Sequence, residues 1–221
     1  MYWVKFDCRI SNRRCVSRFE SGRYATMADK DDLSLLVLRC KVIVVGDAAV
    51  GKSAIVQMFH SKGTHYPKQY AMTTTCDFVM KEVKVPDSNV TVELHIIDCS
   101  GQGVFRELVA EYWKNANMVM LVYDVSNADS FNNLGTWLDL LRKTCPEKVL
   151  PGVLIANKID LEDRFRVHTS EGSEFARTHN LEFVQVSAAR NQNVENPFLV
   201  IGKQFAQMYE EKIDLLSNLN N

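Results

Sequence analysis

The chain contains the stretch Gly46-Asp47-Ala48-Ala49-Val50-Gly51-Lys52-Ser53. This stretch matches the pattern G-x-x-x-x-G-K-[ST] of a phosphate-binding loop. Residues 41–45 before it are a short apolar, β-branched run typical of a buried strand, and residues 53–59 after it can begin a helix. A strand, a glycine loop and a helix in this order are the context that the motif requires.

The expected chemistry of this loop depends on its residue types. Glycines let the backbone curl until several N–H groups point at one anion, and the following helix adds the positive end of its dipole. Lys52 supplies a point charge for the β- and γ-phosphates, and Ser53 offers a hydroxyl to Mg²⁺. Taken alone, the stretch also fits an accidental glycine turn, so the rest of the chain has to decide.

The composition is that of an ordinary globular domain. The chain has 221 residues, 46% hydrophobic and 24% charged, with a formal net charge of −1. This balance gives no basic field, so we expect no nucleic-acid partner. The six cysteines form no C-x-x-C pair and show no metal-ligand spacing, which favours a reducing, intracellular compartment. The longest clean apolar run, Met118–Tyr123, is too short to span a bilayer.

The first part of the chain differs from the remainder. Its arginines are hardly balanced by acids, and no apolar period is sustained. We expect residues 1–35 to be a disordered extension. An arginine-rich organelle presequence is one alternative. Another places the biological start at Met27, just before the compact domain.

Hydrophobic periodicity predicts an α/β fold for residues 36–210, with residues 211–221 as a tail. The pattern predicts a strand over Leu36–Val45 and a helix from Lys52 to about His60. Two runs of alternating apolar and polar residues follow, joined by a turn at residues 86–89, and they predict a hairpin. Strands over 117–123, 149–156 and 181–186 then alternate with helices that begin near residues 129, 169 and 197. We expect a six-stranded, mostly parallel sheet with one antiparallel hairpin strand and helices on both faces.

Polar segments come after several of these strands, where ligands bind in parallel sheets. The first is Asp98-Cys99-Ser100-Gly101-Gln102. Asp98 can hold Mg²⁺ through a water, Gly101 lets a backbone N–H approach the γ-phosphate, and Gln102 can orient an attacking water. Without the phosphate loop, a solvent-facing turn would explain this segment better.

A second pair of segments suits a guanine base. Asp160 in Asn157-Lys158-Ile159-Asp160 can accept two hydrogen bonds from guanine, which adenine cannot donate, and such sites can discriminate by roughly 10⁴-fold. The stem of Lys158 can cover the ring, and Asn157 can tie this loop to the phosphate loop. Ser187 and Ala188 can complete the base pocket through backbone N–H groups.

Thr73 is the best candidate for a residue that senses the γ-phosphate. Its hydroxyl would bind Mg²⁺ and its N–H the γ-phosphate, which would order the loop only in the triphosphate state. Thr74 and Thr75 are its immediate neighbours, so position alone does not single it out, and a polar loop entering a strand is the alternative.

Together these segments, each at a strand end and in this order, carry a resemblance. Over about residues 36–210 the chain resembles Ras-superfamily small GTPases, which implies the G domain of P-loop NTPases. The segment 123–133, with Trp137 and Leu138, is similar to the Rab branch. Similarity to the Rab-like GTPases of the intraflagellar transport machinery rests on residues 59–63, 70–74, 85–87, 196–198 and 209–212.

The resemblance implies a GTP/GDP switch with Mg²⁺ held by Ser53, Thr73 and Asp98. It identifies Thr73 as the switch I threonine and Asp98–Gln102 as switch II, with Gln102 assisting a slow hydrolysis of GTP. Unaided small GTPases turn over at roughly 10⁻⁴ s⁻¹. Ala48 and Ala49 stand where relatives often carry glycine or serine, which predicts a disturbed wall beside the γ-phosphate.

The resemblance also implies partners and a location. Vesicle Rabs need a C-terminal cysteine for a prenyl anchor, but the last cysteine here is Cys145, so we expect no lipid anchor. The implied partners are a small β-sandwich intraflagellar transport protein in a heterodimer, the IFT-B complex, and factors related to the BBSome. The implied locations are the cytoplasm, the cilium or flagellum, and the basal body.

Three other functions remain open from the sequence. A vesicle-trafficking Rab has the same fold, although the C-terminus argues against it. A structural adaptor with an incidental nucleotide would keep the same motifs. A P-loop kinase would leave Asn157–Asp160 without a purpose.

Overall fold

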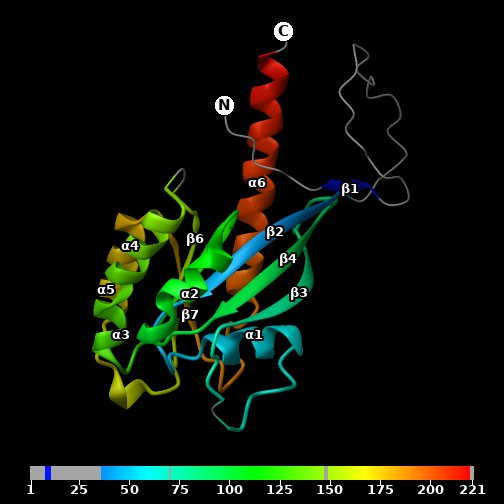
Figure 1. Ribbon diagram of the computed structural model, residues 1–221. Coiled ribbons are helices and arrows are strands. Elements are labelled where there is room, and N and C mark those ends of the chain that lie inside the picture. The colour runs from blue at the N-terminus through cyan, green and yellow to red at the C-terminus, as the bar shows by residue number, and fades with distance from the viewer. Residues whose placement is uncertain (1–7, 11–35, 70, 147–148, 220–221) are drawn as a thin grey trace.

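A mixed β-sheet forms the middle layer of the computed structural model, which describes residues 8–10, 36–69, 71–146 and 149–219 (Figure 1). The strands lie in the order β3-β4-β2-β5-β6-β7, and β1 pairs with β2 off this path. Within the described residues, the β3–β4 and β1–β2 pairs are antiparallel, and the others are parallel. The strands are β1 (Cys8–Ile10), β2 (Leu36–Val45), β3 (Cys76–Lys84), β4 (Val90–Cys99), β5 (Met118–Asp124), β6 (Gly152–Asn157) and β7 (Glu182–Val186).

Helices cover both faces of this sheet. One face carries α1 (Lys52–His60) and α6 (Asn196–Asn218), and the other carries α2 to α5. The bounds on the second face are α2 (Arg106–Ala110), α3 (Ala128–Asn132), α4 (Leu134–Thr144) and α5 (Thr169–Thr178). Short 3₁₀ turns lie at η1 (Gly103–Phe105), η2 (Glu111–Trp113) and η3 (Glu162–Arg164).

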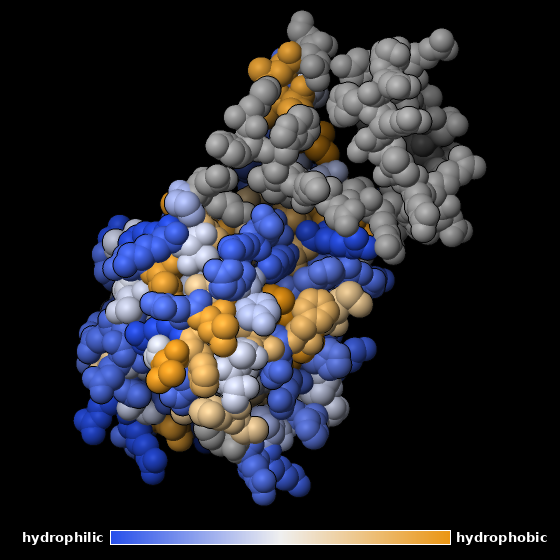
Figure 2. Space-filling view, viewed as in Figure 1, coloured by the Kyte–Doolittle hydropathy of each residue, from blue (hydrophilic) through white to orange (hydrophobic). Residues whose placement is uncertain are grey.

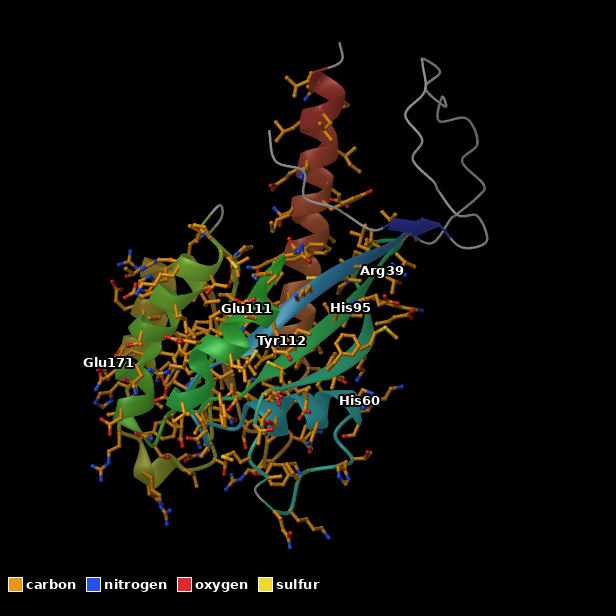
Figure 3. The ribbon with its side chains drawn as sticks, in the orientation of Figure 1. Arg39, His60, His95, Glu111, Tyr112 and Glu171 are labelled. Atoms are coloured by element: carbon orange, nitrogen blue, oxygen red, sulfur yellow. The ribbon has the colours of Figure 1, made fainter. Side chains whose placement is uncertain are left out.

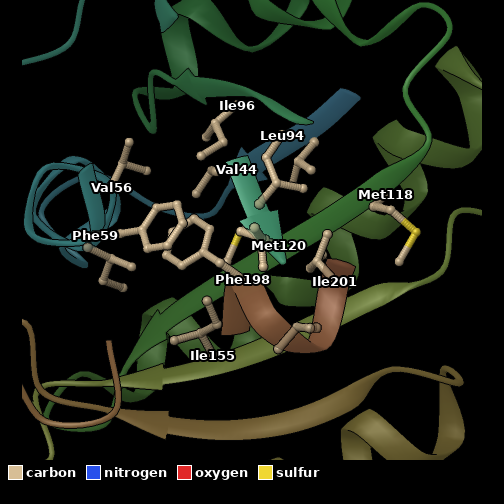
Figure 4. Packing of buried hydrophobic residues seen from close by; sticks show 14 of the residues in the cluster. Val44, Val56, Phe59, Leu94, Ile96, Met118, Met120, Ile155, Phe198 and Ile201 are labelled. Carbon is tan, nitrogen blue, oxygen red and sulfur yellow. The ribbon is translucent and has the colours of Figure 1, made fainter. Parts of the chain in front are cut away.

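Successive side chains of β2 point to opposite faces of the sheet, so this strand contributes to both layers of the core. Val42 and Val44 point to the layer under α1 and α6, whereas Ile43 and Val45 point to the layer under α2 to α5. In the first layer Phe59 of α1 stacks on Phe198 of α6, with ring centroids 3.7 Å apart (Figure 4). Full burial of one such side chain stabilises the fold by about 1.5–3 kcal/mol. The core therefore fixes α1, and with it the phosphate loop, against the sheet.

A polar cluster marks the second sheet face beyond α2. Arg39 on β2 and His95 on β4, which are labelled in Figure 3, contact the carboxylate of Glu93 at 3.1 and 2.7 Å. The hydrogen bond from His95, with help from Arg39, lowers the pKa of Glu93. This cluster lies away from the carboxyl ends of the strands, where the candidate site is found.

The structure confirms the six predicted strands as β2 to β7, with β3 as the antiparallel hairpin strand, and adds β1. The strand Leu36–Val45 and the helix Lys52–His60 have the predicted bounds. The helix predicted from about residue 129 is in fact two helices, α3 and α4, because the chain turns at Asn133 between them. Asn127 caps the first by accepting a hydrogen bond from the Asp129 backbone at 3.0 Å.

Both ends of the chain add secondary structure outside residues 36–210. The short strand β1 lies inside the region predicted to be disordered and extends the sheet at the start of β2. The rest of residues 1–35, including the Met27 alternative, lies outside the described residues. At the other end α6 continues without a break past residue 210, so the predicted tail is helical as far as Asn218. None of the helices in the described ranges has the length and apolar character needed to cross a bilayer.

Candidate nucleotide-binding site

The phosphate loop connects β2 to α1, as the sequence predicts, and its glycines are required by geometry. Gly46 has a φ of 143°, and a Cβ there would lie 2.1 Å from the carbonyl oxygen of Val122. Gly51 has a φ of 98°, and its Cβ would meet the amide of Asn157 at 2.2 Å. Ala49 also has a positive φ, 62°, which costs a non-glycine residue roughly 1–2 kcal/mol. The loop thus keeps its curled backbone in spite of alanine at this position.

Lys52 lies inside the curl of the loop. Its Nζ donates hydrogen bonds to the carbonyl oxygens of Gly46, at 2.9 Å, and Asp47, at 2.7 Å. Only 6% of the residue is exposed. Burial lowers the pKa of Lys52 to about 8, although the negative charge of Asp98 acts to raise it. An anion in the loop would stabilise the charged form, because opposite charges close together favour ionisation.

Three oxygen-bearing side chains meet beside Lys52. The hydroxyl oxygens of Ser53 and Thr73 lie 3.1 Å apart. Asp98 is buried, and its Oδ1 is without a hydrogen-bond partner among the described residues. Burial raises the pKa of Asp98 to about 6, whereas a hydrogen bond from Ser53 and the charge of Lys52 lower it. Hydroxyls and an unpartnered buried carboxylate oxygen fit a hard cation such as Mg²⁺.

Lys52, Ser53 and Thr73 line a cavity of about 330 Å³. Its walls come from the phosphate loop, from residues 66–69 and 71–73 of the segment before β3, and from residues 99–102 of switch II. Gly101 packs so closely on the phosphate loop that a Cβ would lie 2.4 Å from the carbonyl carbon of Asp47. Gln102 lines the same cavity. The three predicted phosphate-side segments therefore share one cavity.

The segments predicted to hold the base also come together. Asn157 donates from Nδ2 to the carbonyl oxygen of Val50 at 2.8 Å and accepts from the Ala188 backbone at 3.3 Å. The predicted tie between Asn157 and the phosphate loop is therefore present. Ser187 donates its hydroxyl proton to Asp160 at 2.6 Å, which orients that carboxylate.

Lys158 occupies an unusual backbone position at the edge of the cavity. Its φ is 67°, and its Nζ lies 2.5 Å from the carboxylate of Asp124 at the end of β5. Lys158 also lines the cavity. The ion pair fixes the ammonium group of Lys158. The sequence predicts only that the aliphatic part of this side chain covers the guanine ring.

Sequence reasoning missed the partners of the Asp47 side chain. Its carboxylate accepts hydrogen bonds from Asn133, at 2.7 Å, and from the indole of Trp137, at 2.8 Å. Arg106 lies 3.5 Å from the same carboxylate and stacks over Trp137 at 4.8 Å from the ring centroid. These partners lie on or next to α2 and α4 and are far away in the chain, so no local pattern could have indicated them.

Comparison with known proteins gives the chain its family. Residues 41–207 match the model of the Ras family. The intraflagellar transport protein 27 homolog of Homo sapiens is 42% identical over 185 residues, which cover 84% of this chain and 100% of that protein. Intraflagellar transport protein 27 of Chlamydomonas reinhardtii is 41% identical over 80% of this chain and 88% of its own length. The homolog of Trypanosoma brucei brucei is 40% identical over 82% of this chain and 98% of its own length.

The family match and the geometry of the site agree. The matched residues include the phosphate loop, the two switch segments and the loops on the base side. The phosphate loop and the two switch segments, together with Lys158, surround one cavity. The resemblance drawn from the motifs is thereby confirmed. The chain belongs to the Ras family of small GTPases, whose members bind guanine nucleotides and hydrolyse GTP.

Proposed function

We propose that this chain is a GTP-dependent switch subunit of the intraflagellar transport machinery. The observation that carries the proposal is the identity of 40–43% to proteins of that name in animals and a trypanosome, over 98–100% of their length. Alignments of this extent support a shared role as well as a shared fold. The alga Chlamydomonas reinhardtii adds a relative of the same name at 41% identity.

The nucleotide site would work through the residues described above. Backbone N–H groups of Gly46–Ser53 and the ammonium of Lys52 would bind the β- and γ-phosphates. Mg²⁺ would be held by Ser53, Thr73 and Asp98, and it would neutralise phosphate charge when bound. This assignment is supported by the hydroxyls of Ser53 and Thr73, which lie close together, and by the Asp98 oxygen, for which the described residues offer no partner.

Asp160 would select guanine. The hydrogen bond from Ser187 holds its carboxylate in place, and the free lone pairs can accept from the N1–H and the 2-amino group of the base. Asn157 would keep this loop in register with the phosphate loop through its bonds to Val50 and Ala188. The loops that bind the base and the loop that binds the phosphates would then be held together by hydrogen bonds.

Hydrolysis would be slow without a helper protein. Gln102 lines the cavity and can orient a water, but the described residues that line it include no arginine. Arg106, the arginine nearest switch II in the chain, is engaged by Asp47 and Trp137. The transition-state charge would therefore lack an arginine in cis, a group that is worth about 10³–10⁵-fold in small GTPases.

The C-terminal end of α6 would contribute to the partner surface. Ile213, Leu215 and Leu219 are 46%, 65% and 81% exposed. Hydrophobic residues are visible at this end of the helix, which projects beyond the sheet away from α1 (Figures 1 and 2). We propose that it packs on a small β-sandwich partner in a heterodimer. The heterodimer would join the IFT-B complex in the cilium and basal body, with a link to BBSome traffic.

A cell experiment tests the proposed function. The tagged chain and its Ser53→Asn variant are expressed in ciliated cells, with Ser61→Asn as a matched change in the loop after α1. We expect the wild type and Ser61→Asn to enter cilia and to carry bound guanine nucleotide, and Ser53→Asn to lose both. Normal ciliary entry and transport by Ser53→Asn would contradict the switch and favour a structural adaptor.

A further inference from the structure

Two thiols face each other where the switch segments meet the sheet. Cys76 is the first residue of β3 and Cys99 the last residue of β4, and the two are register partners in the antiparallel ladder. Their sulfur atoms lie 3.6 Å apart, and both cysteines are free thiols in the structure. Neither thiol has a role in the nucleotide chemistry described above.

The position of this pair in the ladder suits a cross-strand disulfide. Ser100 donates its backbone N–H to the carbonyl of Thr75 at 2.8 Å, so those two residues form a hydrogen-bonded pair. The next pair, Cys76 and Cys99, is then non-hydrogen-bonded, and such pairs have Cα atoms about 4.5 Å apart. This separation lies within the range of about 4.4–6.8 Å that disulfides span. Side-chain rotation can therefore bring the sulfurs together without moving the strands.

The two thiols differ in access. Cys76 is partly exposed, whereas Cys99 is fully buried and accepts a hydrogen bond from the indole of Trp113 at 3.2 Å. An oxidant from solution would therefore reach Cys76 first. Cys99, already in contact with Cys76, is placed to resolve the oxidised intermediate.

We propose that Cys76 and Cys99 form a reversible disulfide that fastens switch I to switch II and slows nucleotide release. A hydroperoxide would oxidise the Cys76 thiol to a sulfenic acid. The O–O bond of the hydroperoxide would break, and an alcohol or water would be released. The Cys99 sulfur would then attack the Cys76 sulfur. The S–O bond would break, the S–S bond would form, and the hydroxyl would leave as water with the proton of Cys99. A dithiol or two equivalents of a monothiol would restore both thiols by exchange.

The expected effect on the site depends on the neighbours of each thiol. Thr73, a proposed Mg²⁺ ligand, lies shortly before Cys76, and Asp98 lies directly before Cys99. A covalent bond at the end of the ladder would prevent the two segments from parting there. This step rests on the proposed function, because it assumes that parting of the segments accompanies nucleotide release.

The first measurement asks whether the bond forms. The full chain is loaded with GDP, treated with hydrogen peroxide, alkylated under denaturing conditions and digested with trypsin. Residues 69–81 and 85–106 are tryptic peptides with one cysteine each. We expect them to be joined, with the loss of two hydrogen atoms, and to separate after reduction. Alkylation of both peptides after oxidation, with no joined product, would overturn the proposal.

The second measurement asks whether the bond acts on the site. Release of a fluorescent GDP analogue is followed for the reduced and the oxidised protein. We expect oxidation to slow release about fivefold or more, the lower range of typical coupling between sites. Cys76→Ser should abolish the joined peptide and the redox effect. Cys145→Ser should keep both, because the Cys145 thiol contacts the backbone carbonyl of Trp113 and takes no part in the proposed disulfide. A joined peptide with unchanged release would overturn the proposed coupling.

The two failures can be told apart. Reduced protein that holds no guanine nucleotide would contradict the proposed function itself. Reduced protein that holds nucleotide but shows no response to the oxidant would leave that function intact and contradict only the thiol switch. The peptide analysis uses the wild-type chain, so it stays decisive even if a cysteine variant fails to fold.

Discussion

The hydroxyl oxygens of Ser53 and Thr73 lie 3.1 Å apart, although 20 residues separate them in the chain. One belongs to the phosphate loop and the other to the loop before β3, so the two segments already meet at the point where a cation would bind. Asp98 from β4 completes the group with a buried oxygen that has no hydrogen-bond partner in the described part of the chain. The arrangement explains how one ion could report the state of the nucleotide to switch I.

The role of Thr73 can be tested by removing its hydroxyl. We expect Thr73→Ala to weaken Mg²⁺ binding to the GTP-bound protein by about tenfold or more, in line with the loss of groups that support metal sites. Binding of GDP should change little, because Thr73 would act only in the triphosphate state. Magnesium titration of nucleotide release measures this. The exposed neighbour Thr74→Ala is the control, and an equal effect of both changes would contradict the assignment.

Base selection by Asp160 gives a second prediction. Asp160→Asn replaces an acceptor by a donor, so binding of GDP should weaken by roughly 10²-fold or more, as expected for two hydrogen bonds to a charged group. Xanthosine diphosphate should gain affinity, since its second carbonyl can accept from the new amide. Competition between the two nucleotides measures the change. Asp163→Asn, an exposed acid in η3, should leave the preference for guanine unaltered. Retained guanine preference in Asp160→Asn would refute the role.

The bond between Asp47 and Trp137 yields a prediction about stability. Trp137→Phe would leave the carboxylate without its 2.8 Å indole donor, and we expect a loss of about 1–3 kcal/mol in the free energy of unfolding beyond the cavity cost. Trp113→Phe is the matched change, because that indole donates only to the weaker acceptor sulfur of Cys99. Urea unfolding of both variants provides the comparison. Equal losses would show that the Asp47 bond adds nothing to packing.

The exposed end of α6 can be tested without disturbing the core. We expect Leu215→Glu with Leu219→Glu to keep the free energy of unfolding within about 0.5 kcal/mol, because both side chains face solvent. Heterodimer formation with the β-sandwich partner should be strongly weakened. Ser217→Glu adds a charge to the same exposed segment and should leave the heterodimer intact. Size-exclusion chromatography of the mixed proteins distinguishes these outcomes, and an intact heterodimer in the leucine variant would count against the surface.

The part of the molecule that depends on local sequence was predicted well. Leu36–Val45, the phosphate loop and the helix from Lys52 rely on residue types that are adjacent in the chain, and the structure has them as predicted. The tie from Asn157 to the phosphate loop was also foreseen, because both segments lie at the carboxyl ends of strands in one parallel sheet. The ligand roles of these residues stay predictions.

Features that depend on distant partners could not be read from the chain. Trp137 lies 90 positions from Asp47, and nothing near either residue indicates their hydrogen bond. Lys158 likewise finds Asp124 only because β5 and β6 are neighbours in the sheet. The division between α3 and α4 was missed since the apolar pattern runs on across Asn133 while the backbone turns there. Local patterns thus located the site, and tertiary packing determined its supports.

In the proposed function, the nucleotide state controls assembly of the chain with the transport machinery. Affinity purification from ciliated cells, with equal amounts of GTP-loaded and GDP-loaded protein as bait, tests it most directly. We expect the GTP-loaded chain to recover the transport complex in clear excess. Lys52→Ala, which lacks the buried ammonium of the phosphate loop, should recover little. Equal recovery by both nucleotide states and by Lys52→Ala would contradict the claim.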